Sequence, residues 1–287
     1  MVKNPEPLLV QGFFHTTTHS ICYVVASLRS RRCFVIDPVR DFDAVSGRTG
    51  RVLVDEIIAF MQHHNLTLEA ILETHVHADH LSGASLLRDI LGGWIGISKG
   101  VMDVRRSFAS FYDLDQESFA QAFPFDRLFD DGDIIGDDDL QARVIATPGH
   151  TPSCISYLME QNLFVGDTLF MPDGGTARCD FPGGDASQLY HSIQRIFALP
   201  SETKIFVCHD YCPNGRSVAW ETTVGEEKLH NIHIKEGISQ AAFVKLRTER
   251  DKTLSLPNLM LLAIQVNVQA GHLPDPNDRG IRHLKFP

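Results

Sequence analysis

A short segment rich in metal-binding side chains most constrains how this chain can fold. The run THVHADH, residues 74–80, holds three imidazoles and one carboxylate within six residues, His75 to His80. Buried histidine and aspartate side chains are costly unless they are paired. Clustered nitrogen and oxygen donors are, by contrast, what a first-row metal ion needs. Because the run follows a predicted buried strand, Glu69–Thr74, we expect a metal-binding loop at a strand end.

Three further donors stand at the ends of predicted strands. His150 lies in the turn TPGHTP, Asp167 in VGDT and His209 in VCHD. Each of them alone could equally be an ordinary turn residue. Together they place donors where α/β folds build their sites, so we expect them to join the histidine cluster.

Predicted strands alternate with predicted helices along the rest of the chain. The predicted strands are Leu8–Phe14, Ser20–Ala26, Cys33–Ile36, Ala142–Thr147, Cys154–Met159, Leu163–Val165 and Lys204–Cys208. The predicted helices are Leu53–His64, Ser82–Leu91, Asp185–Leu199 with Asp185 as N-cap, and the charged stretch Glu221–Lys252. Strands that feed helices in this way indicate a layered α/β architecture.

Composition restricts the partners. The 26 basic and 36 acidic residues give a net charge of −10, which argues against a nucleic-acid surface. The six cysteines form no CxxC pair and are interpreted as free thiols of a reducing compartment. Met1 to Val10 lacks the pattern of a signal peptide, and the apolar run Leu259–Val266 is too short to span a bilayer. These features favour a cytoplasmic protein that does not enter a membrane.

The order and spacing of HxHxDH, PGHTP, GDTLF and a strand-end histidine resemble the metallo-β-lactamase superfamily, over roughly residues 8–235. The resemblance implies an α/β fold, the αββα sandwich of that superfamily. It implies a catalytic domain over residues 1–235 and a C-terminal extension, 236–287, packed on the same domain. In two-metal members, one ion is held by the residues that match His75, His77 and His150, a second by those that match Asp79, His80 and His209, and Asp167 bridges them.

A narrower resemblance is to the persulfide dioxygenases, which are related to glyoxalase II. It is carried by Thr176–Phe181, Leu189–Ile193, Ala198–Pro200 and His209–Tyr211. It implies one Fe(II) per chain on the residues that match His75, His150 and Asp167. The second position, at Asp79, His80 and His209, would then be empty. The family segment RTDF is RCDF here, and the loop before it is longer than in the shorter animal members.

This resemblance implies that glutathione persulfide and O2 are the substrates and that sulfite and glutathione are the products. The residues His77, Asp79, His80 and His209 would then orient the ligands or organise water. Arg178 would face a substrate anion, because a guanidinium fork suits one. A surface salt bridge with Asp180 is the alternative interpretation of Arg178. Tyr211 and Lys228 are further candidates for contact with glutathione.

Two other functions stay open. One is a hydrolase of the glyoxalase II kind that cleaves a glutathione thioester with a two-metal hydroxide, since its ligand set is present. The Arg178 segment favours the dioxygenase, and Arg247–Lys252 is interpreted as an ordinary helix face and not as a basic substrate motif. The other is a non-catalytic sensor or scaffold, against which the intact ligand positions argue. A homo-oligomer, dimer or tetramer, is compatible with any of these.

Overall fold

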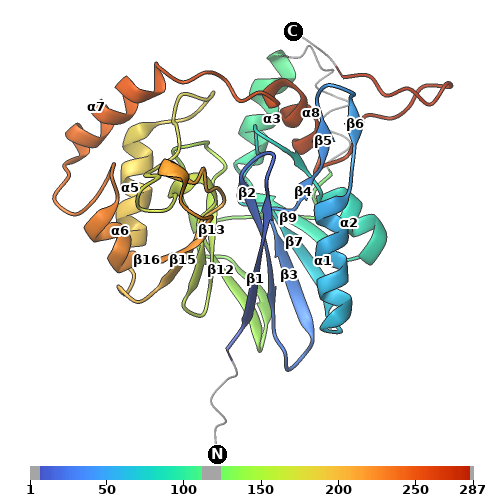
Figure 1. Cartoon of the computed structure of the whole chain (residues 1–287), viewed down its shortest axis with the longest axis horizontal. Helices are drawn as coiled ribbons and strands as arrows, with labels where there is room; N and C mark the ends of the chain where they lie inside the picture. Colours follow the sequence, from blue (N-terminus) through green and yellow to red (C-terminus); the bar gives the residue numbers. More distant parts are fainter. Residues whose placement is uncertain (1–6, 112–123, 285–287) are drawn as a thin grey trace, which may run out of the picture.

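Two six-stranded sheets face each other and carry helices on their outer sides (Figure 1). The computed structural model describes residues 7–111 and 124–284. The first sheet has the order β1 (Leu9–His15), β2 (Ser20–Ala26), β3 (Arg32–Ile36), β7 (Thr67–Leu72), β9 (Trp94–Ser98) and β10 (Arg127–Phe129). The second has the order β11 (Ile134–Asp137), β12 (Leu140–Ala146), β13 (Ile155–Met159), β14 (Asn162–Phe164), β15 (Lys204–Phe206) and β16 (Glu221–Thr223).

Helices cover both outer faces, so the expected αββα sandwich is confirmed. In Figure 1, α1 and α2 lie on one side of the strands and α5 and α6 on the other. The helices are α1 (Val52–His63), α2 (Ala84–Leu91), α3 (Val101–Phe111), α5 (Ala186–Phe197), α6 (Val224–His230), α7 (Gln240–Asp251) and α8 (Met260–Asn267). Two short pairs complete the fold: β4 (Val39–Arg40) with β8 (Leu81–Ser82), and β5 (Phe42–Asp43) with β6 (Arg48–Thr49).

The side chains of strand β2 alternate between two hydrophobic cores, one between the sheets and one beneath α1 and α2. All seven residues of β2 are buried. Ile21 and Tyr23 join the core that lies between the sheets, whereas Cys22 and Val24 join the core beneath α1 and α2. Because successive side chains point to opposite faces, β2 reads as a continuous apolar run.

Most elements expected from the sequence are present. Strand β2 has the expected bounds, and Asp185 caps α5 by accepting hydrogen bonds from the backbone N–H groups of Ser187 and Gln188. Strand β7 ends at Leu72, two residues before the expected end, so Glu73 and Thr74 already belong to the metal-site loop.

The expectation of a helix over Glu221–Lys252 is wrong in part. Its first three residues form β16, which pairs antiparallel with β15. Helix α6 then ends at His230, and the side-chain oxygen of the C-cap residue Asn231 accepts from the N–H groups of His233 and Ile234. This local turn competes with helix continuation, as asparagine side chains commonly do. Helix α7 starts afresh at Gln240.

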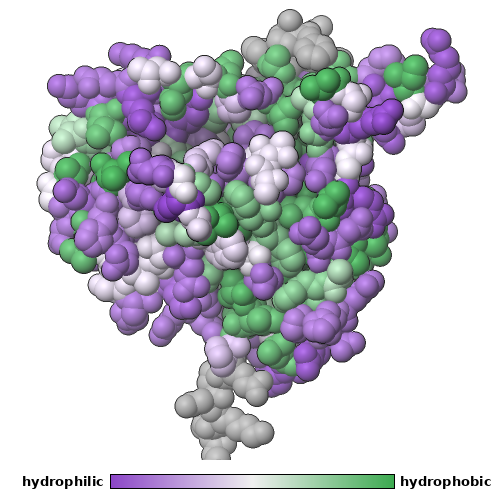
Figure 2. All heavy atoms as spheres, in the orientation of Figure 1, coloured by the Kyte–Doolittle hydropathy of each residue, from purple (hydrophilic) through white to green (hydrophobic). Residues whose placement is uncertain are grey.

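The C-terminal part packs onto the rest of the molecule. Met260, Ile264 and Val268 of the α8 region are buried in the core beneath α1 and α2. The outer surface of α6 and α7 is mostly hydrophilic, as Figure 2 shows on the left of this face. Among the residues that the structure describes, no helix combines the length and apolarity needed to cross a bilayer.

A buried carboxyl group of α6 makes stability depend on pH. Glu227 is fully buried and accepts one hydrogen bond, from Asn231 Nδ2 at 2.6 Å. Its other oxygen, Oε1, has no hydrogen-bond partner among the described residues. Burial raises the pKa of Glu227 from 4.5 to about 8.

We therefore expect Glu227→Gln to flatten the pH dependence of stability. Between pH 4.5 and about 8, the folded chain keeps a proton that the unfolded chain releases. The free energy of unfolding thus falls as pH rises, by at most about 1.4 kcal/mol per pH unit from this group. Urea unfolding at pH 6 and pH 8 measures the difference, with the exposed Glu236→Gln as control. Equal slopes in the wild type and Glu227→Gln would contradict it.

Candidate metal centre

The carboxylate of Asp167 lies among three imidazoles at one end of the sandwich. Its Oδ2 is 3.8 Å from His75 Nε2 and 3.6 Å from His150 Nε2, and its Oδ1 is 3.4 Å from His209 Nε2. His75 follows β7 of the first sheet, whereas the other three residues follow β12, β14 and β15 of the second. Strand ends of both sheets therefore build one site, as predicted.

Several of these side chains and their neighbours have buried polar atoms that are unsatisfied. The buried atoms His75 Nε2, His80 Nε2, His209 Nε2, Asp167 Oδ1 and His77 Nδ1 have no hydrogen-bond partner in the described chain. Leaving such atoms unpaired would be costly. His75, His150 and Asp167 offer ligand atoms within 4.8 Å of one another, as a metal ion requires. Two imidazoles and a carboxylate are a fitting donor set for iron or zinc.

A second cluster adjoins the first. His77, Asp79, His80 and His209 also offer ligand atoms within 4.8 Å of one another. His209 Nε2 is 3.5 Å from Asp79 Oδ2, and Ser20 Oγ lies 3.2 Å from His80 Nδ1. The structure thus brings together every side chain that the sequence predicts at the centre.

The rings of His75 and His150 are fixed through the nitrogen that faces away from Asp167. Thr74 Oγ1 is 3.0 Å from His75 Nδ1, and the backbone oxygen of Arg178 is 2.7 Å from His150 Nδ1. A carbonyl oxygen can only accept, so Nδ1 of His150 carries the hydrogen and its Nε2 lone pair is free for a metal.

Gly166 allows Asp167 to approach Thr74. Its φ is +52°, and a Cβ at this position would lie 2.5 Å from Thr74 Oγ1. Glycine adopts this backbone conformation without the strain that a side chain would add. The turn therefore brings the ligand loop of the second sheet against the histidine loop of the first.

Helix α7 holds the segment that fixes His150. Arg247 is 1% exposed, donates from Nη1 to the oxygen of Thr176 at 2.9 Å, and binds Asp251 Oδ1 through Nε and Nη2. Asp251 Oδ2 in turn accepts from the N–H of Cys179 at 2.9 Å. The segment is thus held on both sides of Arg178. The expectation that Arg247–Lys252 is an ordinary helix face is wrong, because one side of the helix carries this buried ion pair.

Two buried carboxylates that the sequence interpretation missed hold His77. Its Nε2 lies 3.0 Å from Asp37 Oδ1 and 3.3 Å from Glu73 Oε2. Burial lowers the pKa of His77, but these carboxylates outweigh it and raise the pKa well above its usual value. Burial raises the pKa of Glu73. Both carboxylates follow strand ends, β3 and β7, and that position is the signal that could have revealed them.

Asn267, at the end of α8, ties the C-terminal part to the histidine loop. Its Nδ2 donates to the backbone oxygens of His77 at 2.8 Å and His80 at 2.7 Å, and its Oδ1 accepts from the N–H of Ser82 at 2.8 Å. All three bonds are buried, and they join residues that are 185 to 190 positions apart in the sequence. No local pattern could have predicted this contact.

A cavity of about 960 Å³ opens onto the centre. Its lining includes His150 and Asp167 together with Arg178 and Tyr211. The ring of Tyr211 stacks on that of His209, with the centroids 5.8 Å apart. Lys228 lies on α6 and is not among the lining residues, so the structure places it apart from the cavity.

Arg178 is engaged within the chain. Its Nε and Nη2 donate to the two oxygens of Asp180 at 2.6 and 2.7 Å, and its Nη1 donates to the backbone oxygen of Ser255 at 2.6 Å. The salt bridge considered as the alternative interpretation is therefore present. Arg178 still lines the cavity, but its fork already holds a carboxylate.

The family follows from this geometry and from sequence comparison. The sequence profile described as the Metallo-beta-lactamase superfamily matches residues 15–209, a span that contains every ligand candidate. The chain belongs to this superfamily. The family and the His/Asp cluster together imply that the chain uses a metal ion.

Similar proteins carry several different names. A probable metallo-hydrolase of Burkholderia pseudomallei is 45% identical over 98% of this chain and 99% of that protein. Glyoxylase B2 of Dictyostelium discoideum is 44% identical over 92% of this chain and 91% of that protein. A beta-lactamase hydrolase-like protein of Xylella fastidiosa is 47% identical over 97% of this chain, which spans only 64% of that protein's length.

The persulfide dioxygenase named in the sequence resemblance is also a relative. The human mitochondrial persulfide dioxygenase ETHE1 is 30% identical over 92% of this chain and 89% of that protein. The crystal structure of ETHE1 from Myxococcus xanthus superposes with a TM-score of 0.74, at 30% identity, over 92% of this chain and all of that one.

We expect Asn267→Asp to weaken both the fold and the metal site. The change keeps the acceptor for Ser82 but replaces the donor to two buried carbonyls, and each carbonyl left unpaired costs about 1–3 kcal/mol. Metal affinity should fall about 10- to 100-fold, as is usual when a group that orients ligands is lost. Chemical unfolding and metal titration check both effects. Gln269→Glu makes the same amide-to-acid change without a buried partner, and an equal effect there would contradict the assignment.

Proposed function

We propose that the chain is a persulfide dioxygenase that holds one ferrous iron on His75, His150 and Asp167. In this proposal, glutathione persulfide, dioxygen and one water give glutathione, sulfite and two protons. The observation that carries it is the cluster of two imidazoles and one carboxylate beside a large cavity. His75, His150 and Asp167 would hold a ferrous ion through three ligands, the donor set typical of iron oxygenases. The similarity to ETHE1 proteins supports the same activity.

The chain's own side chains orient this centre. Bound ferrous iron would mediate electron transfer from the persulfide sulfur to dioxygen, which zinc cannot do because it has no redox chemistry. Thr74 and the Arg178 carbonyl keep two imidazoles turned toward that ion. In this proposal Asp79, His80 and His209 hold and orient the water that the reaction consumes, since His209 Nε2 lies 3.4 Å from Asp167 Oδ1 and 3.5 Å from Asp79 Oδ2. In this proposal they do not carry a second metal.

The cavity suits a tripeptide with two carboxylates. Its volume is in the range of pockets that enclose small ligands. Because the Arg178 fork is held by Asp180, we assign the substrate carboxylates to Arg48 on β6 and Arg250 on α7. Both line the cavity, and in the described chain neither forms an ion pair. A chain with a net charge of −10 needs such local cations to attract an anion.

A glyoxalase II-like hydrolase is the second candidate. The complete second cluster, His77, Asp79, His80 and His209, favours it, because a two-metal hydroxide needs those donors. The name of the Dictyostelium relative points the same way. The two candidates differ in the number and kind of metal ions, which gives a direct test.

We expect about one iron per chain after anaerobic purification, and oxygen uptake with glutathione persulfide. His75→Ala and His150→Ala should abolish metal binding, because each removes one of three ligands. His209→Ala should keep most of the iron and alter turnover. Elemental analysis and oxygen-electrode assays measure these outcomes.

Two zinc ions per chain, with thioester hydrolysis that survives removal of iron, would establish the hydrolase instead. Loss of iron in His209→Ala equal to that in His75→Ala would show that the ligand assignment is wrong.

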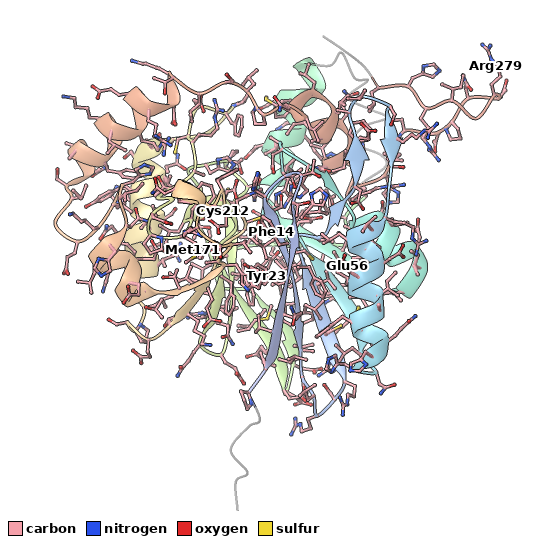
Figure 3. All side chains as sticks on the ribbon, in the orientation of Figure 1. Phe14, Tyr23, Glu56, Met171, Cys212 and Arg279 are labelled. Atoms are coloured by element: carbon pink, nitrogen blue, oxygen red, sulfur yellow. The ribbon has the colours of Figure 1, made fainter. Side chains whose placement is uncertain are left out.

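We expect Arg48→Gln and Arg250→Gln each to raise KM for glutathione persulfide with little change in kcat. These guanidinium groups are exposed, so each contact should contribute about 1 kcal/mol, or roughly fivefold. A substrate whose carboxylates are esterified should not distinguish the variants from wild type. Arg279→Gln is the matched control, because Arg279 lies at the far edge of the molecule (Figure 3). A loss confined to Arg178→Ala would return the anion-binding role to Arg178.

A further inference from the structure

A chain of hydrogen-bonded side chains leads from the metal centre to the cavity wall. Ser20 Oγ lies 3.4 Å from Asp79 Oδ2 and 3.2 Å from His80 Nδ1. Thr18 Oγ1 is 2.8 Å from Ser20 Oγ and 2.7 Å from His15 Nδ1. These hydrogen bonds join the histidine loop that follows β7 to the turn between β1 and β2.

His15 is the outer end of this chain. It is the last residue of β1, directly after Phe14, which Figure 3 labels near the middle of the molecule. Its side chain is 10% exposed and lines the cavity, and its Nε2 lies 3.4 Å from Asp41 Oδ1. Asp41 also lines the cavity, and its Oδ2 is buried without a hydrogen-bond partner among the described residues.

The arrangement has a consistent direction for hydrogen. Ser20 Oγ carries one hydrogen, which it can donate to Asp79 Oδ2 at 3.4 Å or to Thr18 Oγ1 at the shorter distance of 2.8 Å. When Ser20 donates to Thr18, the Thr18 hydroxyl donates to His15 Nδ1. The imidazole then carries its hydrogen on Nε2, facing Asp41. Burial lowers the pKa of His15 even though the carboxylates of Asp41 and Asp79 act in the opposite direction. A neutral ring of this kind is able to accept a proton.

The proposed reaction releases two protons per turnover at a centre whose ligands are buried. Hydrolysis of a thioester releases one proton, so either candidate function produces protons at this centre. The cavity reaches His150 and Asp167, but among the described residues that line it His80 and His209 are absent, whereas His15 and Thr18 are present. The side chains of Ser20, Thr18 and His15 make a continuous path from His80 to that cavity.

We propose that Ser20, Thr18 and His15 form a proton relay between the metal centre and the cavity, with Asp41 as its outer acceptor. A proton released from water held beside Asp79 and His80 arrives at Ser20 Oγ, the Ser20 hydroxyl proton passes to Thr18 Oγ1, and the Thr18 proton passes to His15 Nδ1. The Nε2 proton of His15 then passes to Asp41 or to water. No electrons move in these steps. The relay deepens the proposed function but does not require the substrate to be a persulfide.

Thr18→Val tests the relay with a side chain of nearly the same shape. We expect kcat to fall about 10- to 100-fold, at unchanged KM and metal content, because acid–base groups typically contribute at least that much. The solvent isotope effect on kcat should rise, since proton transfer becomes slower. Thr16→Val is the matched control, because Thr16 is exposed in the same turn and belongs neither to the described cavity lining nor to the chain of bonds. Equal rates and isotope effects for the two variants would overturn the relay.

His15→Ala distinguishes a proton carrier from a residue that only supports the fold. Imidazole added to the solution should restore part of kcat in His15→Ala but not in Thr18→Val, where the missing link is a hydroxyl. Restoration in neither variant would count against His15 as a proton carrier. All assays are run with both glutathione persulfide and a glutathione thioester. The same pattern with the thioester alone would uphold the relay while rejecting the dioxygenase.

Nitrogen NMR of His15 provides a readout that needs no turnover. We expect a neutral ring at pH 7 with hydrogen on Nε2, and a changed Nδ1 shift in Thr18→Val but not in Thr16→Val. A ring that is protonated on both nitrogens at pH 7 would overturn the proposal, because it could not accept a further proton.

Discussion

The burial of one carboxylate among three imidazoles is the constraint on which the rest of this structure depends. Asp167 is 8% exposed, and its two oxygens face rings that come from both sheets. A buried carboxylate is stable only when opposite charge and hydrogen bonds compensate for lost hydration. A metal cation between these side chains supplies that charge. The strand ends of the two sheets must therefore meet at one point, and the sandwich is the fold that brings them there.

The imidazole rings and the histidine loop are held by hydrogen bonds from residues in distant parts of the chain. The carbonyl of Arg178 fixes His150, and the α7 pair Arg247 and Asp251 holds that segment in turn. Asn267 of α8 holds the histidine loop. Because second contacts of this kind set ring orientation, the C-terminal helices contribute to the metal site without supplying a ligand. Helix α7 is hydrophilic on its outer surface and carries the buried polar contacts on its inner side.

The sequence predicted the parts of the site that have a local signature. HxHxDH and the donors after strands are visible because each follows an apolar run, and Ser20–Ala26 is visible because its apolar residues are uninterrupted. Arg247 was misinterpreted, because an arginine four residues before an aspartate is usual on an exposed helix face. The prediction of one helix over Glu221–Lys252 was wrong in part, because strand pairing at its start and the turn at Asn231 outweigh the helix propensity of the segment. Contacts that join residues nearly 190 positions apart carry no local signal.

The two candidate reactions share most of their requirements, which explains why one scaffold is compatible with both. Each uses a glutathione derivative that carries carboxylates, consumes a water molecule near the centre, and releases protons. The cavity, the cluster beyond Asp167 and the hydroxyls of Thr18 and Ser20 meet these needs for either reaction. What separates the reactions is electron supply, since dioxygen must be reduced and a thioester need not be. The choice of function therefore reduces to which ion the triad of His75, His150 and Asp167 retains, and to whether the neighbouring donors bind water or a second metal.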